Sequence, residues 1–397
     1  MLYFLIRPVA RYVLRYYFRR IDIQGLEHIP QDGAVILAAN HPTAFIEPCL
    51  LACFQSRPLH FLARGDLYKT KWASWVLRAL RILPVYRLQD GGYGKLTENY
   101  ATFAACHRVL SGGGALMILA EGRCIHEKRL RPLRKGTARV ALGALDRDAT
   151  LSEVYVVPVG VNFVAADRVR SEVYLRCGSP LKASDYLATY RQHEATGLRE
   201  LTDELRQALS PLVLQLPDPA TDAVYEAILD VVRSQTTPGT DPFLAEQLQL
   251  AKGPPDARAV GYRQRLTHLG LSDRDVLHAA TDRPFPWISL VALPLLLPQL
   301  PLWGIAEWIA LTGPRTIEFY SPVRFAVLGV GTLLYFPLLW VLPVAGAIYL
   351  LVSLLLTDWS LRQLERLREW RGARRAAKLP ADTLAQLRTL REELLRD

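Results

Sequence analysis

The chain lacks the cysteine patterns that hold small secreted domains or zinc sites together. Its five cysteines are scattered and form no Cys-x-x-Cys pair; they are Cys49, Cys53, Cys106, Cys124 and Cys177. An odd number of unpaired cysteines argues against a disulfide framework and against a structural zinc site. We therefore expect no metal, and a reducing, cytosol-facing compartment.

Motifs of covalent hydrolysis and of secretion are missing too. No Gly-x-Ser-x-Gly stretch is present, so the nucleophile elbow of serine hydrolases is not expected. The first twenty residues lack the uninterrupted apolar core and the cleavage site of a secretory signal. Instead, arginines recur every fourth residue among apolar side chains, at positions 7, 11, 15 and 19. This spacing predicts an amphipathic helix over residues 1–21 that lies in a membrane interface, with packing on the protein's own core as the alternative.

Charge is absent from two long segments near the C-terminus. Residues 284–306 and 325–357 contain no charged side chain, and each reaches the roughly 20 residues that cross a bilayer. We predict two membrane segments within residues 283–357, with a buried core helix as the alternative. Prolines interrupt both, which leaves full crossing and a re-entrant hairpin open. The arginine-rich tail, residues 358–397, is expected to be cytoplasmic, and two crossings would place the preceding domain on that same side.

The sequence has enough apolar residues for a large folded domain. Half of its 397 residues are hydrophobic, and between residues 22 and 217 short β-rich runs alternate with longer helical ones. This alternation predicts an α/β domain, a sheet flanked by helices. The expected strands are 34–39, 59–63, 115–120, 154–160 and 172–177, and the expected helices include 72–80 and 97–110. Residues 218–282 are predicted to be a helical region of unknown role.

The net charge of +10 and pI near 9.4 point to an anionic partner. Nucleic acid, anionic lipid and a phosphorylated substrate all satisfy that charge. The basic stretch that begins at Lys128 has no interleaved aromatic side chains for base stacking. Because the membrane segments account for the charge better, we expect no nucleic-acid partner.

The stretch NHPTAFIEP, residues 40–48, places ionisable groups at the end of the apolar run AVILAA. A histidine with an ordinary pKa near 6.5 can take a proton from a hydroxyl at neutral pH. His41 is therefore a candidate general base, and Glu47 could hold its second ring nitrogen. Taken alone, a histidine and a glutamate at this spacing are also consistent with a purely structural hydrogen bond.

Three further blocks follow in order along the chain. LPVYR ends in Arg87, AEGR spans residues 120–123 at the end of the apolar run ALMILA, and VPVG spans residues 157–160. The basic segment RPLRKGTAR comes shortly after the AEGR block. An arginine can bind a phosphate through two parallel hydrogen bonds, and a glycine lets the backbone approach it closely.

The four blocks in this order resemble the glycerolipid acyltransferase family, typified by bacterial lysophosphatidate acyltransferases, over roughly residues 22–180. The resemblance implies an acyltransferase-type α/β sheet, with His41 as general base and Glu47 as the carboxylate that orients it. It also assigns acceptor binding to Asn40, Arg87, Glu121, Gly122, Arg123 and Lys135, and the acyl channel to Val157 and Pro158. Backbone N–H groups near the first block could stabilise the oxyanion.

Two departures from the family pattern affect these assignments. The acidic residue is a glutamate six positions after the histidine, where the family usually has an aspartate five positions after it. One extra residue rotates a helical position by about 100°, so the pairing requires Pro42 and Thr43 to lie in a loop before the helix. In the third block, Ala120 replaces a proline and the threonine position is missing.

The resemblance implies a membrane enzyme that transfers a fatty acyl group from acyl-CoA or acyl carrier protein to a lysophospholipid, above all lysophosphatidate to phosphatidate. Glycerol 3-phosphate is the rival acceptor within the same chemistry. A catalytically degenerate, membrane-anchored lipid-binding or scaffold protein is the alternative of another class. Membrane lipids, the acyl donor thioester and the acceptor are the expected partners, no cofactor is expected, and the catalytic domain is expected on the cytoplasmic face of the inner (plasma) membrane.

Overall fold

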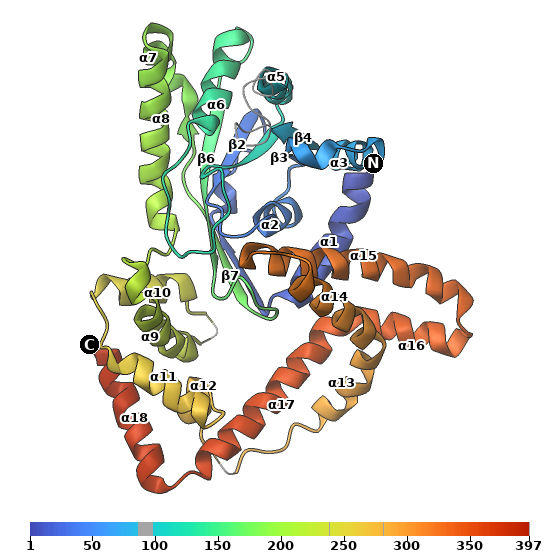
Figure 1. Cartoon of the computed structure of the whole chain (residues 1–397), viewed down its shortest axis with the longest axis vertical. Coiled ribbons are helices and arrows are strands. Elements are labelled where there is room, and N and C mark those ends of the chain that lie inside the picture. The colour runs from blue at the N-terminus through green and yellow to red at the C-terminus, as the bar shows by residue number, and fades with distance from the viewer. Residues whose placement is uncertain (86–97, 238, 281, 397) are drawn as a thin grey trace. The chain divides into compact units, whose positions relative to one another are not determined.

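The computed structural model describes residues 1–85, 98–237, 239–280 and 282–396 (Figure 1). The chain divides into two compact units, the first formed by Met1–Val213 with Gly304–Leu334 and the second by Leu214–Trp303 with Tyr335–Asp397. The five-part division expected from the sequence, at residues 21, 217, 282 and 357, stays a prediction.

The first unit is built on a mixed sheet, which confirms the predicted α/β class. Its strands, among the described residues, run in the order β1-β7-β6-β2-β5-β3-β4, with β8 beside β6. They are β1 (Arg20–Gln24), β2 (Ala34–Ala39), β3 (Leu59–Arg64), β4 (Ile82–Val85), β5 (Ala115–Leu119), β6 (Val154–Phe163), β7 (Glu172–Cys177) and β8 (Leu181–Lys182). All pairs are parallel except those of β7 and β8 with β6.

Helices cover both faces of this sheet (Figure 1). They are α1 (Leu2–Tyr17), α2 (Ile46–Phe54), α3 (Lys71–Ala79), α5 (Glu98–Ser111), α6 (Gly136–Arg147), α7 (Leu187–Gln192) and α8 (Glu194–Leu209). Ile36 and Ala38 of β2 join the core beneath α5, α6 and α8, whereas Val35 and Leu37 point to the opposite face and are equally buried. Because both faces of the strand are covered, β2 reads as a continuous apolar run.

The N-terminal helix α1 packs on α2, and its arginines contact the protein itself. Arg7 donates to backbone carbonyls just beyond α2, and the Arg11 guanidinium lies 5.4 Å from the ring centre of Phe54. Arg19, just after the helix, pairs with Glu172 of β7. These contacts favour the alternative in which the helix packs on the domain's core, while the interfacial placement stays a prediction.

The apolar C-terminal segments are helical. They are α13 (Ile288–Leu296), the 3₁₀ turn η7 (Leu297–Gln299), α14 (Leu300–Thr312), α15 (Tyr320–Val341) and α16 (Val344–Leu355). Among the described residues, Ile288–Thr312 and Ile317–Val341 are long and apolar enough to cross a membrane, and α16 with the next helix forms a pair bent by 66°. The two predicted segments thus each overlap one candidate membrane helix, and the second predicted run is divided between α15 and α16.

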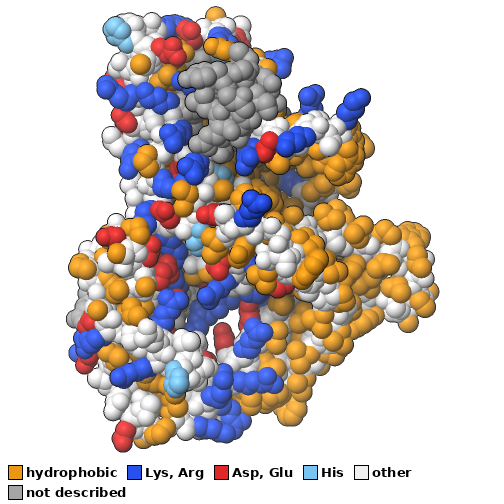
Figure 2. Space-filling model, in the orientation of Figure 1, with side chains coloured by type: hydrophobic (Ala, Val, Ile, Leu, Met, Phe, Trp, Pro, Cys, Tyr) orange, Lys and Arg blue, Asp and Glu red, His pale blue; other side chains and the backbone are white. Residues whose placement is uncertain are grey.

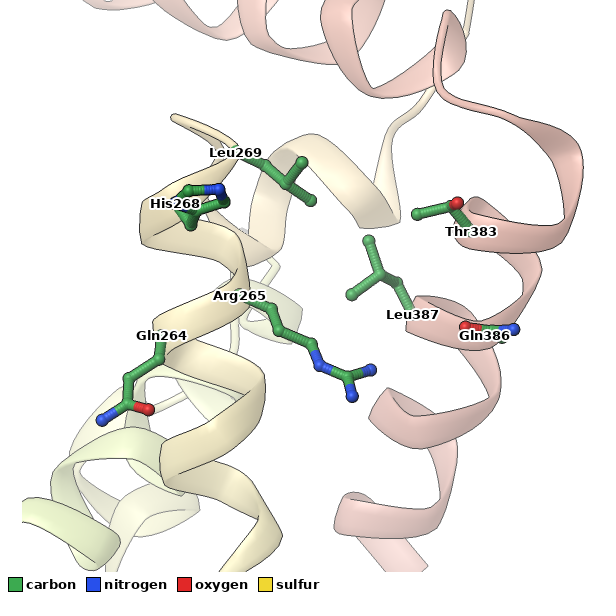
Figure 3. Close-up of a pocket in the computed structure, with 7 residues that line it drawn as sticks. All are labelled: Gln264, Arg265, His268, Leu269, Thr383, Gln386 and Leu387. Atoms are coloured by element: carbon green, nitrogen blue, oxygen red, sulfur yellow. The ribbon is translucent and has the colours of Figure 1, made fainter.

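The second unit also contains helices outside the apolar segments. They are α9 (Asp222–Gln235), α10 (Pro242–Ala251), α11 (Arg258–His268), α12 (Asp273–Leu277), α17 (Thr357–Ala377) and α18 (Ala381–Arg396). A groove of about 360 Å³ separates α11 from α18, with Arg265 and His268 on one wall and Leu387 on the other (Figure 3). None of the residues predicted for the active site lines this groove.

Candidate active site

Strand pairing brings the first and third sequence blocks together. Strands β2 and β5 are parallel neighbours with Ala39 opposite Leu119, so their carboxyl ends lie at the same edge of the sheet. In open α/β sheets this edge is where ligands bind. His41 and Glu121 each follow their strand by two residues, and the backbone N–H of His41 donates to Glu121 Oε2 at 2.8 Å.

The histidine and the glutamate of the first block lie face to face. Helix α2 begins only at Ile46, so residues 40–45 form the loop that the six-residue spacing requires. Glu47 is fully buried in the first turn of the helix, and its Oε1 lies 3.6 Å from Nδ1 of His41. That nitrogen has no hydrogen-bond partner among the described residues. An approach of about 0.8 Å would close a hydrogen bond of ordinary length.

Thr43 fixes the orientation of the Glu47 carboxylate. Its backbone N–H donates to Glu47 Oε1 at 2.6 Å, and its hydroxyl donates to Oε2 at 2.7 Å. The same hydroxyl accepts from the backbone N–H of Ile46 at 3.2 Å. The sequence indicated that Thr43 belongs to the loop, but not that it holds the carboxylate.

Arg131 ties the loops after β2 and β5 together, a role that the sequence did not reveal. Its guanidinium lies 2.5 Å from Glu121 Oε2 and donates to the backbone carbonyl of His41 at 3.2 Å. Its backbone N–H donates to Glu121 Oε1 at 2.9 Å. Both Glu121 oxygens therefore bind the protein, and the expected contact of Glu121 with an acceptor stays a prediction. In the sequence, Arg131 is one of six lysines and arginines between residues 128 and 139, and its spacing does not distinguish it from the others.

Asn40 fastens the end of β2 to its other neighbour. Its amide donates to the carbonyl of Val161 at 3.0 Å and accepts from the N–H of the same residue at 2.7 Å. This exchange continues the ladder between β2 and β6 by one more step. Its predicted part in substrate binding would have to use the remaining amide hydrogen and lone pair.

Gly122 and the two predicted cations lie at the surface end of the site. Gly122 has φ +71°, and a Cβ there would come within 3.1 Å of the side chain of Arg134. Arg123 is exposed, and Lys135 is exposed at the N-cap of α6. The exposed N-terminal peptide groups of a helix favour anions, so the cations and α6 suit the same kind of ligand.

The other predicted residues divide into two cases. Val157 and Pro158 are buried in the middle of β6, opposite Leu37 and Ala38 of β2. Their predicted role in the acyl channel is not tested by that position. Arg87 lies outside the described residues; the chain is described up to Val85, the end of β4.

A segment from far along the chain contacts the His41 loop. The carbonyl of Glu318 accepts from the backbone N–H of Ala44 at 3.1 Å, and its carboxylate accepts from the N–H of His126 at 3.4 Å. The backbone N–H of Ile125 donates in turn to the carbonyl of His41 at 3.2 Å. Glu318 lies between the two apolar segments, outside the four blocks, and no sequence signal connects it with them.

The buried thiols are poorly suited to act as nucleophiles. Burial raises the pKa of Cys53, Cys106 and Cys177 to about 12. Because the thiolate is the reactive form, these side chains are almost entirely protonated at neutral pH.

Comparison with known proteins identifies the domain that carries this arrangement. Residues 20–162 match the family described as Acyltransferase, a range that contains His41, Glu47, Glu121 and Arg131. The chain is 22% identical over 271 residues to glycerol-3-phosphate O-acyltransferase 2 of Saccharomyces cerevisiae, covering 65% of this chain and 32% of that protein. It is 24% identical over 127 residues to the chloroplastic 1-acyl-sn-glycerol-3-phosphate acyltransferase BAT2 of Brassica napus, covering 32% of this chain and 35% of that protein.

One solved structure also resembles the chain, at a lower sequence identity. The crystal structure of the 1-acyl-sn-glycerophosphate (LPA) acyltransferase PlsC from Thermotoga maritima aligns with 17% identity and a TM-score of 0.38, over 53% of this chain and 78% of that one. The aligned regions of the two curated relatives span only about a third of each protein's length. The family match and the distant relatives confirm the resemblance drawn from the four blocks: residues 20–162 of this chain form a domain of the acyltransferase family.

Proposed function

We propose that this protein is a glycerolipid acyltransferase that uses His41 and Glu47 to acylate a lysophospholipid, with lysophosphatidate as the first candidate acceptor. The observation that supports it most is the burial of Glu47 beside Nδ1 of His41 within the family-matched segment. A buried carboxylate next to an imidazole stabilises the imidazolium that forms when the ring takes a proton.

In the proposed reaction, Glu47 faces Nδ1 of His41, and the other ring nitrogen, Nε2, removes the proton from the acceptor hydroxyl. The hydroxyl oxygen attacks the carbonyl carbon of the acyl thioester and forms a C–O bond. The tetrahedral intermediate then breaks its C–S bond, and the released thiolate recovers the proton from His41. No covalent acyl-enzyme is needed, in keeping with the high pKa of the buried thiols.

The acceptor's phosphate is proposed to lie near Arg123, Lys135 and the N-terminus of α6. Both side chains are exposed cations close to the loop that carries Glu121. Arg131, by contrast, is engaged with Glu121 and the His41 carbonyl, which suits a role in holding the loops.

Glycerol 3-phosphate is the second candidate acceptor. One observation favours it: the match with the yeast glycerol-3-phosphate O-acyltransferase 2 covers 65% of this chain, well beyond the family domain. Both acceptors offer a hydroxyl and a phosphate, so the same residues would serve either.

The test is acyl transfer by the purified, detergent-solubilised chain, with labelled acyl-CoA or acyl carrier protein and a panel of lysophosphatidate, glycerol 3-phosphate and other lysophospholipids. We expect one acceptor to be acylated, and His41→Ala to lower the rate by about 10²- to 10⁴-fold, the usual contribution of a general base. His107→Ala, which changes a histidine on α5, is the matched control and should keep the wild-type rate. Full activity of His41→Ala would exclude the mechanism, and no transfer to any acceptor would favour a lipid-binding or scaffold protein.

A further inference from the structure

The junction between the two apolar segments is attached to the catalytic domain. Arg324 of α15 donates to the backbone carbonyl of Asp167 at 2.5 Å and pairs through two nitrogens with Glu307 of α14, at 2.6 and 2.8 Å. One turn earlier, Ser321 accepts from the hydroxyl of Tyr17 in α1 at 2.8 Å. With the contacts of Glu318 described above, the end of the first apolar segment and the start of the second lie on the side of the membrane where the catalytic domain lies.

The beginning of the first apolar segment lies on that side too. The described part of residues 214–287 contains no helix that meets the criteria for a membrane span. The helices there carry buried ion pairs, such as Arg233 with Glu246 at 2.7 Å and Arg391 with Asp273 at 3.0 Å, which suit an aqueous unit and not a bilayer. Since no described helix between the catalytic domain and residue 288 meets these criteria, the segment 288–312 starts and ends on the same side.

This segment does not turn back on itself, because Ile288–Thr312 is one continuous helical run of 25 residues. A helix whose two ends lie on the same side of a membrane lies along that face. Pro294 lies inside α13, and the 3₁₀ turn η7 separates α13 from α14. The buried side chain of Gln299 donates to the carbonyl of Ser353 at 2.9 Å and also to Thr357. These contacts join the middle of the first segment to the end of α16.

The second apolar segment reverses its direction between two helices. Helix α15 leads to a turn at residues 342–343, from which α16 continues (Figure 1). Within the second unit, Tyr335 of α15 donates to the carbonyl of Pro298 at 2.8 Å, and Ser353 near the end of α16 donates to the carbonyl of Leu295 at 2.6 Å. Helices α15 and α16 therefore both contact residues 295–298 of the first segment.

Helix α16 alone is too short to cross the bilayer. Helix α16 has 12 residues, about 18 Å at 1.5 Å per residue, whereas the hydrocarbon core is about 30 Å thick. The helix that follows, α17, is rich in arginine and glutamate, and its Trp370 donates to the carbonyl of Arg283 at 3.0 Å. The tail thus lies on the side of residue 283, which precedes the first apolar segment.

The turn between α15 and α16 is strongly apolar and exposed. Trp340 is 92% exposed, Val341 80% and Val344 77%. Figure 2 shows hydrophobic side chains covering these helices densely. An apolar surface of this kind on a charge-free segment fits the hydrocarbon of a bilayer.

We propose that the protein is monotopic: segment 288–312 lies along the face of the bilayer that carries the catalytic domain, segment 320–355 enters and leaves from that same face, and no described part of the chain crosses to the other face. The acceptor and product lipids would then be exchanged with one leaflet only. This topology is independent of the proposed reaction, because an inactive protein would show it equally well.

The test is sided cysteine labelling of the full chain in inside-out and right-side-out vesicles, with a membrane-impermeant maleimide polymer that adds a mass shift above the unsubstituted chain. Arg199→Cys on α8 reports the side of the catalytic domain. We expect Arg315→Cys, between the two segments, and Lys378→Cys, in the tail, to be labelled in the same vesicles as Arg199→Cys and not in the others. Trp340→Cys should be labelled only after detergent is added. Thr316→Cys, which also lies between the two segments and is exposed, replaces Arg315→Cys if that variant does not accumulate.

Two results would overturn the proposal. Labelling of the cysteine at position 315 or 378 from the face opposite to Arg199→Cys would show a full crossing. Labelling of Trp340→Cys in either intact vesicle would show that the turn lies in water. Loss of acyl transfer with the expected labelling pattern would refute only the proposed function.

Discussion

The charge on Glu47 should matter for catalysis more than its shape. Glu47→Gln keeps the volume of a fully buried side chain and removes the negative charge 3.6 Å from Nδ1 of His41. At the 3.6 Å separation, an effective dielectric constant of about 20 gives about 4.6 kcal/mol of attraction to an imidazolium, an upper limit of roughly 10³-fold in rate. Since the glutamine oxygen still accepts one hydrogen bond, we expect kcat to fall about 10²-fold with KM nearly unchanged.

Stability must be separated from catalysis in this variant, because Glu47 also accepts two hydrogen bonds from Thr43. Loss of one bond to a charged group costs about 2 kcal/mol of unfolding free energy. Glu153→Gln is the matched control. Glu153 accepts hydrogen bonds from the backbone N–H groups of Val154 and Ser184 and from the Ser184 hydroxyl. The Glu153→Gln variant should therefore lose stability but keep kcat. In a His41→Ala background, Glu47→Gln should cause no further loss of kcat. Equal losses in both backgrounds would show that Glu47 does not act through His41.

Three further changes test the structure around the site. Arg131→Ala leaves Glu121 buried without its cation and should lower the free energy of unfolding by about 3 kcal/mol in urea titrations; an unchanged midpoint would show that the pair is not formed. Gly122→Ala places a side chain at φ +71° and should cost about 1–2 kcal/mol by the same assay, so a neutral result would contradict the left-handed turn. Burial, with the charge of Arg147, lowers the pKa of His107 below its ordinary 6.5, so the folded state keeps the ring neutral and loses stability as the pH falls from 6.5 through that lowered pKa. His107→Leu should flatten this acid-side loss in thermal unfolding scans, and an identical pH profile would refute the assignment.

The sequence predicted the centre of the sheet well because those strands are covered on both faces. Apolar or mainly apolar runs gave β2 with the bounds that the structure shows, and the starts of β3, β5 and β6. The bounds of β7 were also predicted, although EVYLRC contains two charged residues. The edge strands were not predicted. β1 alternates apolar and polar residues in RIDIQ, and β4 is four residues long with a proline, so neither produces such a run.

The site was predictable only where its residues fall in the ordered blocks. His41 and Glu121 follow apolar strands, and parallel neighbours bring strand ends together, so their proximity follows from the fold class. Thr43 and Arg131 act through hydrogen bonds whose partners depend on loop conformation. No spacing rule selects one threonine or one arginine from a polar loop.

Glu318 contacts the site although it lies outside residues 22–180, the range of the family resemblance. It lies between two apolar segments, yet its carbonyl and carboxylate accept from the loops that follow β2 and β5. A buried backbone N–H that loses its acceptor costs about 1–3 kcal/mol, so the His41 loop depends in part on a segment outside the family domain. The same contacts join the end of α14 and the start of α15 to the catalytic domain. The segment between the two candidate membrane helices is therefore linked to the conformation of the loop that carries the proposed base.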